Sequence, residues 1–181
     1  QVIITDHHAF PPANQIPDAN AIVMAKYPRH QYHPDPSGNS REDFCGAGVA
    51  LKITQALTGQ ISKRIMSLAA LGTVADSVNL VFENRVIVAL GLANIRQAPG
   101  CGLWALAHVS RINLAKLTST ELSFTLIPRL NALGRMGDAN LGVQLLTTSD
   151  SVKAVNLAVI TEQRNRERQK IMQQETKAAL A

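Results

Sequence analysis

The sequence predicts an α/β fold that is mostly helical and contains few, parallel strands. Apolar residues make up 46% and aromatic residues 4% of the 181 residues, a balance that suits α or α/β proteins better than β-sandwiches. The apolar, β-branched run at residues 2–5 is typical of a buried strand in a parallel sheet, and residues 21–25 form a second short apolar run. The length is sufficient for one well-buried domain but too short for two large ones.

The residues after the second predicted strand indicate a surface loop and then a series of helices. Residues 27–43 are rich in Pro, His and polar side chains and have no periodicity, which predicts the loop. Gly59 is a candidate C-cap, and Thr118 with Glu121 forms a capping box. Pro128 is expected to interrupt the helix that this box begins. The predicted helices are 46–57, 61–75, 84–97, 103–108, the one that begins at the capping box, and 139–147.

The last predicted helix is long. It begins at cap candidates in Ser149-Asp150-Ser151 and has no Gly or Pro up to Ala181. Beyond Thr161 it is polar on all sides, as in helices that bridge two domains. We therefore expect a domain over residues 1–148 and a connecting helix over 149–181. Because an apolar strand follows Gln1 at once, we also expect the sequence to begin inside a larger domain.

Charge and composition limit the class of protein. The net charge is +5, and residues 61–181 contain fourteen basic and eight acidic side chains, which permits an anionic partner without requiring one. No stretch approaches the roughly 18 apolar residues of a membrane span, and there is no signal-peptide pattern. Cys45 and Cys101 lack CxxC spacing and are predicted to be reduced core thiols. These features predict a cytoplasmic protein that does not bind membranes.

The most informative motif is Asp6-His7-His8, directly after the first predicted strand. In open α/β sheets, ligand sites lie beyond the carboxyl ends of the strands. Asp oxygen and His nitrogen are both ligands of Mn, Fe and Zn, so the triplet is a candidate metal site. A polar loop without a metal would have the same residues, and the motif alone leaves both possibilities open.

Two further segments have candidate site residues at the ends of predicted helices. Asp76 follows the apolar helix 61–75, where the helix dipole disfavours an acid, so either a nearby cation or a solvent-facing loop would explain it. Gly46 and Gly48 lie at the start of another helix, where small residues let the backbone approach a phosphate. Close packing between a helix and a sheet is the commoner reason for such glycines.

A third segment, residues 128–135, has two arginines and an amide around a predicted turn at Gly134. Arg129, Asn131 and Arg135 could bind phosphate oxygens in this arrangement, because guanidinium groups make bidentate hydrogen bonds to them. Solvated arginines on a loop would give the same pattern.

Taken together, these segments resemble the RecJ family of single-strand-specific 5′→3′ exonucleases, within the DHH phosphoesterase superfamily. The Asp-His-His triplet alone would imply only the superfamily, whereas its combination with the other motifs is specific to RecJ-like nucleases. The resemblance covers essentially the whole chain. The matching segments are residues 3–8, 45–50, 70–76, 83–85 and 128–139.

The resemblance implies a catalytic domain with a two-metal site, occupied by Mn²⁺ or Mg²⁺, that activates water for hydrolysis of phosphodiester bonds. Residues 1–148 would be the later part of that domain. Since neighbouring side chains on a strand point to opposite faces, we expect His7 to bind metal and His8 to contact the scissile phosphate. The implied catalytic residues are Asp6, His7, His8 and Asp76; the metal ligands are Asp6, His7 and Asp76; the substrate contacts are His8, Gly46, Gly48, Arg129, Asn131 and Arg135.

The chain also departs from the family pattern. The Asp-x-Asp cluster and the further Asp that supply most metal ligands are absent, and so is the C-terminal domain with its glycine-rich His motif. The 181-residue chain by itself is therefore expected to bind metal weakly and to have no nuclease activity.

The expected function is that of a single-stranded-DNA-specific 5′→3′ exonuclease in DNA repair and recombination. Its expected partners are single-stranded DNA, single-strand-binding protein and a RecQ-type helicase. Two alternatives are a DHH phosphoesterase acting on short oligonucleotides or cyclic dinucleotides, and a non-catalytic DHH-like scaffold that binds single strands.

Overall fold

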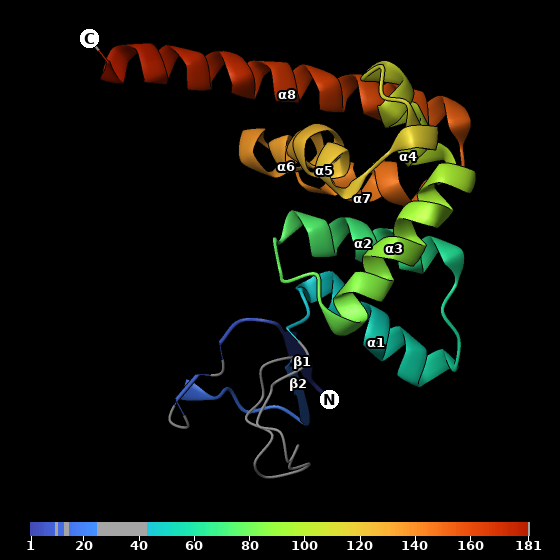
Figure 1. The fold of residues 1–181 in the computed structure, drawn as a ribbon. Helices are drawn as coiled ribbons and strands as arrows, with labels where there is room; N and C mark the ends of the chain where they lie inside the picture. Colours follow the sequence, from blue (N-terminus) through green and yellow to red (C-terminus); the bar gives the residue numbers. More distant parts are fainter. Residues whose placement is uncertain (10, 13–14, 25–42, 181) are drawn as a thin grey trace. The chain divides into compact units, whose positions relative to one another are not determined.

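The structure is a computed structural model that describes residues 1–9, 11–12, 15–24 and 43–180 (Figure 1). Almost all of the predicted surface loop, residues 27–43, lies outside the described residues. The chain divides into two compact units, Gln1–Gly91 and Leu92–Ala181, which we call unit 1 and unit 2 and describe separately. The helix α3 (Phe82–Gln97) runs through the boundary between them.

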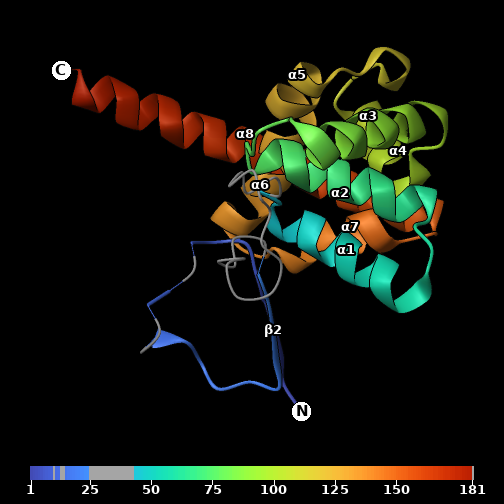
Figure 2. The same cartoon turned by 60° about the horizontal axis from the view of Figure 1, so that its bottom comes forward.

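The described residues of unit 1 form two short strands and two complete helices. The strands β1 (Ile3–Asp6) and β2 (Ala21–Met24) pair in parallel, with Ile3 opposite Ala21 and Asp6 opposite Met24. The helices α1 (Gly46–Thr58) and α2 (Lys63–Ala75) lie side by side (Figures 1 and 2). Gly59 ends α1 in the left-handed conformation, as predicted. The predicted fold class, mostly helical with few parallel strands, is confirmed.

The prediction that the first strand is buried is wrong for the described residues. Side chains of β1 alternate between exposed and half-buried, and Ile3 is 66% exposed. A parallel sheet is buried when helices cover both of its faces. Here α1 packs against β1, and the alternate side chains of the two-stranded sheet reach solvent.

Small residues bring α1 and α2 close together. A Cβ atom at Gly72 of α2 would collide with the Cβ of Ala47 in α1, so only glycine fits there. The buried thiol of Cys45 caps α1 by accepting a hydrogen bond from the Gly48 amide, and its Sγ lies 3.6 Å from Oγ1 of Thr73. The amino end of α1 is thereby held against the carboxyl end of α2. The buried apolar residues of this unit are Phe44, Val49, Leu51, Ala69, Ala70 and Ile87.

Unit 2 is a helical assembly around the long helix α8 (Ser151–Ala179). Asp150 caps α8 by accepting from the amides of Val152 and Lys153. Residues 169–180 are exposed, and this end of α8 extends beyond the other helices of the unit (Figures 1 and 2). The connection of α8 to a further domain stays a prediction. The helices that pack against α8 are α4 (Gly100–Val109), α6 (Ile127–Met136) and α7 (Asn140–Thr147), and the short α5 (Ser119–Glu121) precedes α6.

The predicted interruption at Pro128 and the predicted turn at Gly134 are both wrong. The capping box of Thr118 and Glu121 is present, and helical structure then continues through a π-helical turn at residues 122–126 into α6. Pro128 lies in the first turn of α6, where its missing N–H disturbs the helix least. Gly134 is inside α6, and the chain turns at Gly137 instead.

A buried carboxylate connects three segments of unit 2. Oε2 of Glu162 in α8 accepts hydrogen bonds from Nε of Arg129 (2.7 Å) and Oγ of Ser110 (3.3 Å), and Oε1 accepts from Nε of Arg166 (3.0 Å). Burial opposes ionisation of Glu162, but the hydrogen bonds and charges of Arg129 and Arg166 outweigh it and lower the pKa of this carboxyl. Glu162 is therefore an ionised group within the packed helices.

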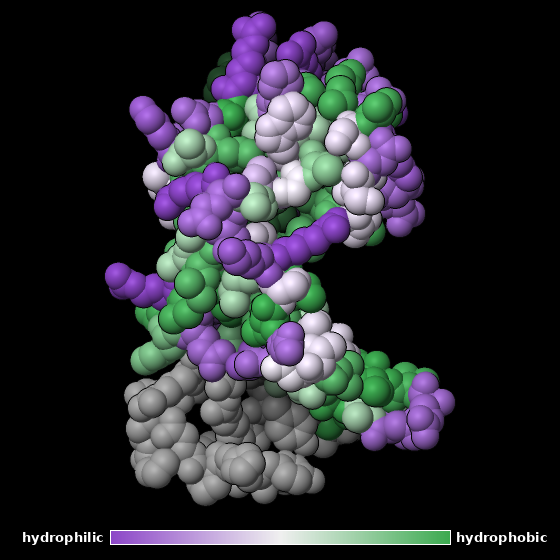
Figure 3. All heavy atoms as spheres, turned by 90° about the vertical axis from the view of Figure 1, so that its right-hand side faces the viewer, coloured by the Kyte–Doolittle hydropathy of each residue, from purple (hydrophilic) through white to green (hydrophobic). Residues whose placement is uncertain are grey.

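Apolar side chains are also found on the surface. Figure 3 shows one face, on which hydrophobic side chains (green) lie among hydrophilic ones (purple). Leu57 in unit 1 and Phe124 in unit 2 are largely exposed. Among the described residues no single helix is long and apolar enough to cross a membrane; α3 and α4 pass that test only as a bent pair.

Two helical glycines of unit 2 should respond in opposite ways to alanine. A Cβ at Gly102 would collide with the backbone carbonyl of Leu145, whereas at Gly134 the nearest atom is 3.8 Å away. We expect Gly102→Ala to destabilise the chain by about 1–3 kcal/mol through overpacking. Gly134→Ala should stabilise it by up to about 1 kcal/mol through helix propensity. Thermal unfolding followed by circular dichroism measures both, and equal effects would contradict the packing described for α4 and α7.

Glu162→Gln should destabilise the chain at neutral pH but not in acid. A lowered pKa in the folded state means that the ionised carboxylate contributes stability above the ordinary glutamate pKa, and that this contribution is lost as the pH falls through the folded pKa. Urea unfolding should show a deficit of about 1–3 kcal/mol for the variant near pH 7, shrinking below about pH 4. The control is Glu167→Gln, which removes an exposed pair with Arg164 and should change little. A deficit independent of pH would contradict an ionised Glu162.

Candidate metal centre

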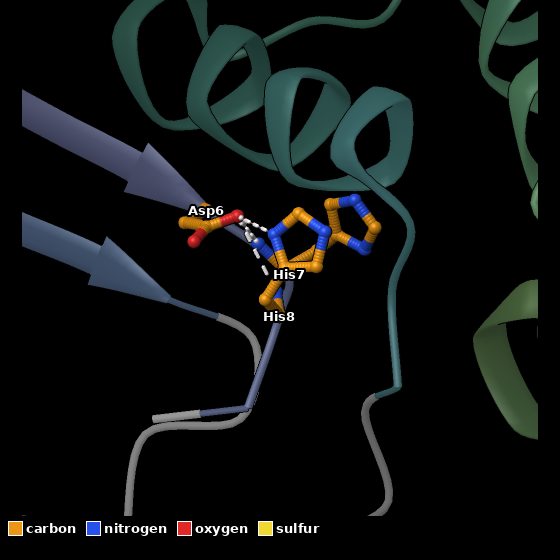
Figure 4. A group of neighbouring side chains, drawn as sticks. All are labelled: Asp6, His7 and His8. Carbon is orange, nitrogen blue, oxygen red and sulfur yellow. Dashed lines mark hydrogen bonds and ion pairs between the residues drawn. The ribbon is translucent and has the colours of Figure 1, made fainter. Parts of the chain in front are cut away.

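Asp6, His7 and His8 gather where β1 ends (Figure 4). Oδ1 of Asp6 accepts hydrogen bonds from the amides of His7 (2.7 Å) and His8 (3.3 Å) and from Nδ1 of His8 (2.7 Å). These bonds turn the chain sharply after the strand. One donor atom from each residue lies within 4.8 Å of the other two, so the turn brings all three potential ligands into one small volume.

The same hydrogen bonds determine the protonation of Asp6. The hydrogen bond from the His7 amide, followed by that from the His8 side chain, lowers the pKa of the Asp6 carboxyl. Asp6 is therefore ionised at neutral pH. A carboxylate in this state is a ligand for a divalent cation without first losing a proton.

The alternation of a strand predicted that the two histidines point to opposite faces, and this prediction is wrong. Their ring centroids are 4.4 Å apart and the planes are inclined by 31°. The alternation fails because β1 ends at Asp6, so neither histidine is part of the strand. They differ in exposure instead, with 23% of the His7 side chain and 75% of the His8 side chain accessible.

Asp76 approaches the Asp6-His7-His8 cluster from the end of α2. It is the C-cap residue of α2, and its Oδ2 lies 3.4 Å from Nδ1 of His7. The helix dipole disfavours an acid at this position unless positive charge is near. A protonated His7 or a bound cation would supply it, and the structure thus brings Asp76 together with the Asp6-His7-His8 cluster.

The two glycines of α1 have different surroundings. A Cβ at Gly46 would lie 3.4 Å from Cδ2 of His7, so the first residue of α1 borders the imidazole. A Cβ at Gly48 would lie 3.1 Å from Cβ of Phe44, and the Gly48 amide donates to Cys45. Gly46 thus belongs to the centre, whereas the contacts of Gly48 are those of helix packing and capping.

The predicted phosphate-binding residues of unit 2 lie on α6. Asn131 and Arg135 are one helical turn apart and both exposed, so they share a face. In the part of the chain that the structure describes, the Arg135 guanidinium has no hydrogen bond or ion pair. Arg129 is different, because its Nε binds Glu162 and its Nη1 donates to the Thr125 carbonyl (2.8 Å).

Asn84 had no role from the sequence alone. Asn84 is buried in the first turn of α3 and donates to the backbone carbonyls of Asp43 and Asn79. Its only signal in the sequence was its place in the matching segment 83–85. Long-range hydrogen bonds of this kind have no periodicity that a sequence pattern could show.

The donor set fits a divalent cation. Carboxylate oxygen together with imidazole nitrogen suits Mn²⁺ and similar ions. Within the described residues, Asp6, His7 and His8 form a group that could hold a metal, and Asp76 adjoins it through His7. Four ligands are enough for one ion, while a two-metal site calls for further donors.

Comparisons with known proteins agree with the motifs, although no family model matches the sequence. The chain is 40% identical over 179 residues to the single-stranded-DNA-specific exonuclease RecJ of Bacillus subtilis, and the match covers 99% of this chain and 22% of that protein. Across the curated RecJ relatives it matches, the chain spans 22–31% of their length.

Solved structures give the same result. The crystal structure of RecJ in complex with Mn²⁺ from Thermus thermophilus superposes with a TM-score of 0.81 at 30% identity, over 98% of this chain and 26% of that one. The structure of the Thermus protein with Mg²⁺ gives 0.70 over 81% of this chain and 24% of that one, at 31% identity. In sequence and in fold, this chain belongs to the RecJ family, of whose members it spans about a quarter.

Proposed function

We propose that this chain is part of a metal-dependent, single-stranded-DNA-specific 5′→3′ exonuclease that hydrolyses phosphodiester bonds. The observation that carries the proposal is the convergence of Asp6, His7, His8 and Asp76 at the carboxyl edge of a parallel sheet. The names of its relatives support the reaction class and the substrate, since they are single-stranded-DNA-specific exonucleases.

Each residue of the centre has a proposed role. Asp6, His7 and Asp76 hold Mn²⁺ or Mg²⁺, the ions named for the Thermus RecJ structures. A bound divalent ion supplies a nucleophilic water at neutral pH and stabilises charge on the phosphate. His8, whose side chain is the more exposed of the two imidazoles, contacts the scissile phosphate. The backbone at Gly46, and more weakly at Gly48, borders the path of that phosphate.

Unit 2 supplies contacts to the DNA backbone. Residues 92–181 contain eleven Lys and Arg against six Asp and Glu, so the net positive charge of the protein resides there. Asn131 and Arg135 are the exposed, available pair on α6. Arg129 keeps only part of its guanidinium for a phosphate, because Nε binds Glu162 and one N–H of Nη1 donates to the Thr125 carbonyl.

The remaining metal ligands would come from other parts of the full-length protein. The 181-residue chain alone should bind Mn²⁺ weakly and release no nucleotides. Single-strand-binding protein and a RecQ-type helicase stay predicted partners, and a cytoplasmic role in repair and recombination stays a prediction.

Removing a ligand should abolish activity without unfolding the protein. In the full-length protein, we expect His7→Ala and Asp76→Ala to reduce Mn²⁺-dependent release of nucleotides from single-stranded DNA on the order of 100-fold or more. The control is His108→Ala, which removes an exposed histidine in unit 2. Near-normal turnover of either ligand variant in Mn²⁺ would overturn the assignment.

The two arginines of α6 should give different phenotypes. Arg135→Ala should weaken single-strand binding and flatten the slope of log affinity against log salt by about 0.7, the value for one phosphate contact. Arg135→Lys should recover affinity only in part, because it lacks the bidentate fork. Arg129→Ala should mainly lower the melting temperature, since it leaves Glu162 with fewer partners in a buried site. An unchanged salt slope for Arg135→Ala would contradict the proposed contact between Arg135 and the DNA backbone.

A further inference from the structure

We propose that Asn84 is a positioning residue of the metal centre, which holds the residues flanking Asp76 and Gly46 in place through two backbone hydrogen bonds. The inference rests on the proposed function, because it concerns how the centre of that enzyme is kept assembled. Within the described residues the hydrogen bonds of Asn84 go to backbone carbonyls and not to a candidate ligand, so it acts through the segments that carry the ligands.

The side-chain amide of Asn84 joins two separate segments of backbone. The residue is 4% exposed, and its Nδ2 donates to the carbonyl of Asp43 (2.9 Å) and to the carbonyl of Asn79 (3.1 Å). Both protons of the amide are thereby used. Both bonds are part-buried, and they give the buried Asn84 amide the partners that its N–H groups would otherwise lack.

Each carbonyl belongs to a residue three positions along the chain from a residue of the centre. Asp43 precedes Cys45, the cap of α1, by two residues, and the first residue of α1 is Gly46, which borders His7. Asn79 follows Asp76 by three residues in the turn that leaves α2. A single side chain therefore links the residues that lead into α1 with the residues that follow α2. The start of α1 contributes Gly46 to the centre, and the end of α2 contributes Asp76.

The turn that Asn84 holds is strained. Ser77 and Phe82 both have positive φ, 57° and 43°, although neither is a glycine. Such a conformation is unusual for any residue with a Cβ and a clear outlier for a bulky one. Strained residues persist where the surrounding structure holds them, and they cluster at functional sites. Asn79 lies between the two strained positions, so the bond from Asn84 restrains the middle of the turn directly after Asp76.

Capping of α3 does not account for Asn84. An asparagine that caps a helix accepts a backbone N–H through Oδ1. Among the described residues, Oδ1 of Asn84 has no hydrogen-bond partner, although it is buried. The side chain thus acts through its donors alone and leaves a buried acceptor unsatisfied, which calls for an explanation other than capping.

The test uses the full-length protein with Asn84→Ala and a matched core variant, Ile87→Ala. Ile87 is buried one turn further along α3 and has no polar side-chain atom that could bond to either segment. Three quantities are measured: Mn²⁺ affinity by calorimetry, hydrogen exchange of the amides of Asp76 and Ser77, and kcat as a function of Mn²⁺ concentration. Those amides bond to the carbonyls of Gly72 and Val74 and so report on the exit from α2.

We expect Asn84→Ala to weaken Mn²⁺ binding by about 10–100-fold, as loss of groups that orient ligands does. Exchange at Asp76 and Ser77 should accelerate, and high Mn²⁺ should restore much of kcat while KM for DNA stays near its original value. Ile87→Ala should lower the melting temperature but leave Mn²⁺ affinity and the exchange of these two amides unchanged. Asn84→Ser, which keeps one donor, should lie between wild type and Asn84→Ala, and it decides the question if the alanine variant does not fold.

The outcomes separate the two proposals. Unchanged Mn²⁺ affinity and exchange in a folded Asn84 variant would overturn the positioning role, while a loss of activity in His7→Ala would still support the function. Equal effects of Asn84→Ala and Ile87→Ala on Mn²⁺ affinity and exchange would also overturn the positioning role, because a general loss of stability would then explain both variants. Absence of nuclease activity in the unmodified protein would contradict the function, whereas the Mn²⁺ affinity and exchange results would still report on Asn84.

Discussion

At Gly72 the backbones of α1 and α2 approach so closely that any side chain would collide with Ala47, and the candidate centre depends on this contact. The approach places the start of α1 beside the end of α2, where the Cys45 thiol meets the Thr73 hydroxyl. Gly46 then borders His7, and Asp76 emerges next to the same imidazole. A bulkier residue at Gly72 would separate α1 from α2, and so the Gly46 end of α1 from Asp76.

The centre combines a local and a long-range construction. Asp6 organises its own neighbours through three hydrogen bonds to a single oxygen, so that part needs only a few residues after a strand. Asp76 arrives through helix packing, and the strained turn behind it is restrained by Asn84. Helices and strands that are rigidly packed position catalytic groups more precisely than free loops do, which suits a metal centre with a narrow tolerance for ligand distances.

Unit 2 shows how similar residues on one helix acquire different tasks. Arg129 and Arg135 both lie on α6. Arg129 forms an ion pair with the buried carboxylate of Glu162, whereas Arg135 is exposed to solvent. The lowered pKa of Glu162 reflects how strongly its arginine partners favour the ionised form over the cost of burial. A buried charge requires its partners. Arg129 is therefore part of the packing of α6 against α8, and the charge available to an anionic ligand lies elsewhere on the helix.

The sequence by itself determined what depends on local chemistry: the parallel strands, the capping box at Thr118, the left-handed cap at Gly59 and the Asp6-His7-His8 cluster at the end of β1. Its motifs also indicated the RecJ family. Tertiary structure decided what depends on residues far apart in the chain, since no periodicity encodes which partners meet. The packing of Gly72 against Ala47, the meeting of Asp76 with His7 and the pairing of Arg129 with Glu162 are of this kind. The errors at Pro128 and Gly134 have a related cause, because a local rule treats each residue as a helix breaker. In the structure a π-helical turn precedes Pro128, and the helix continues past Gly134 to Met136.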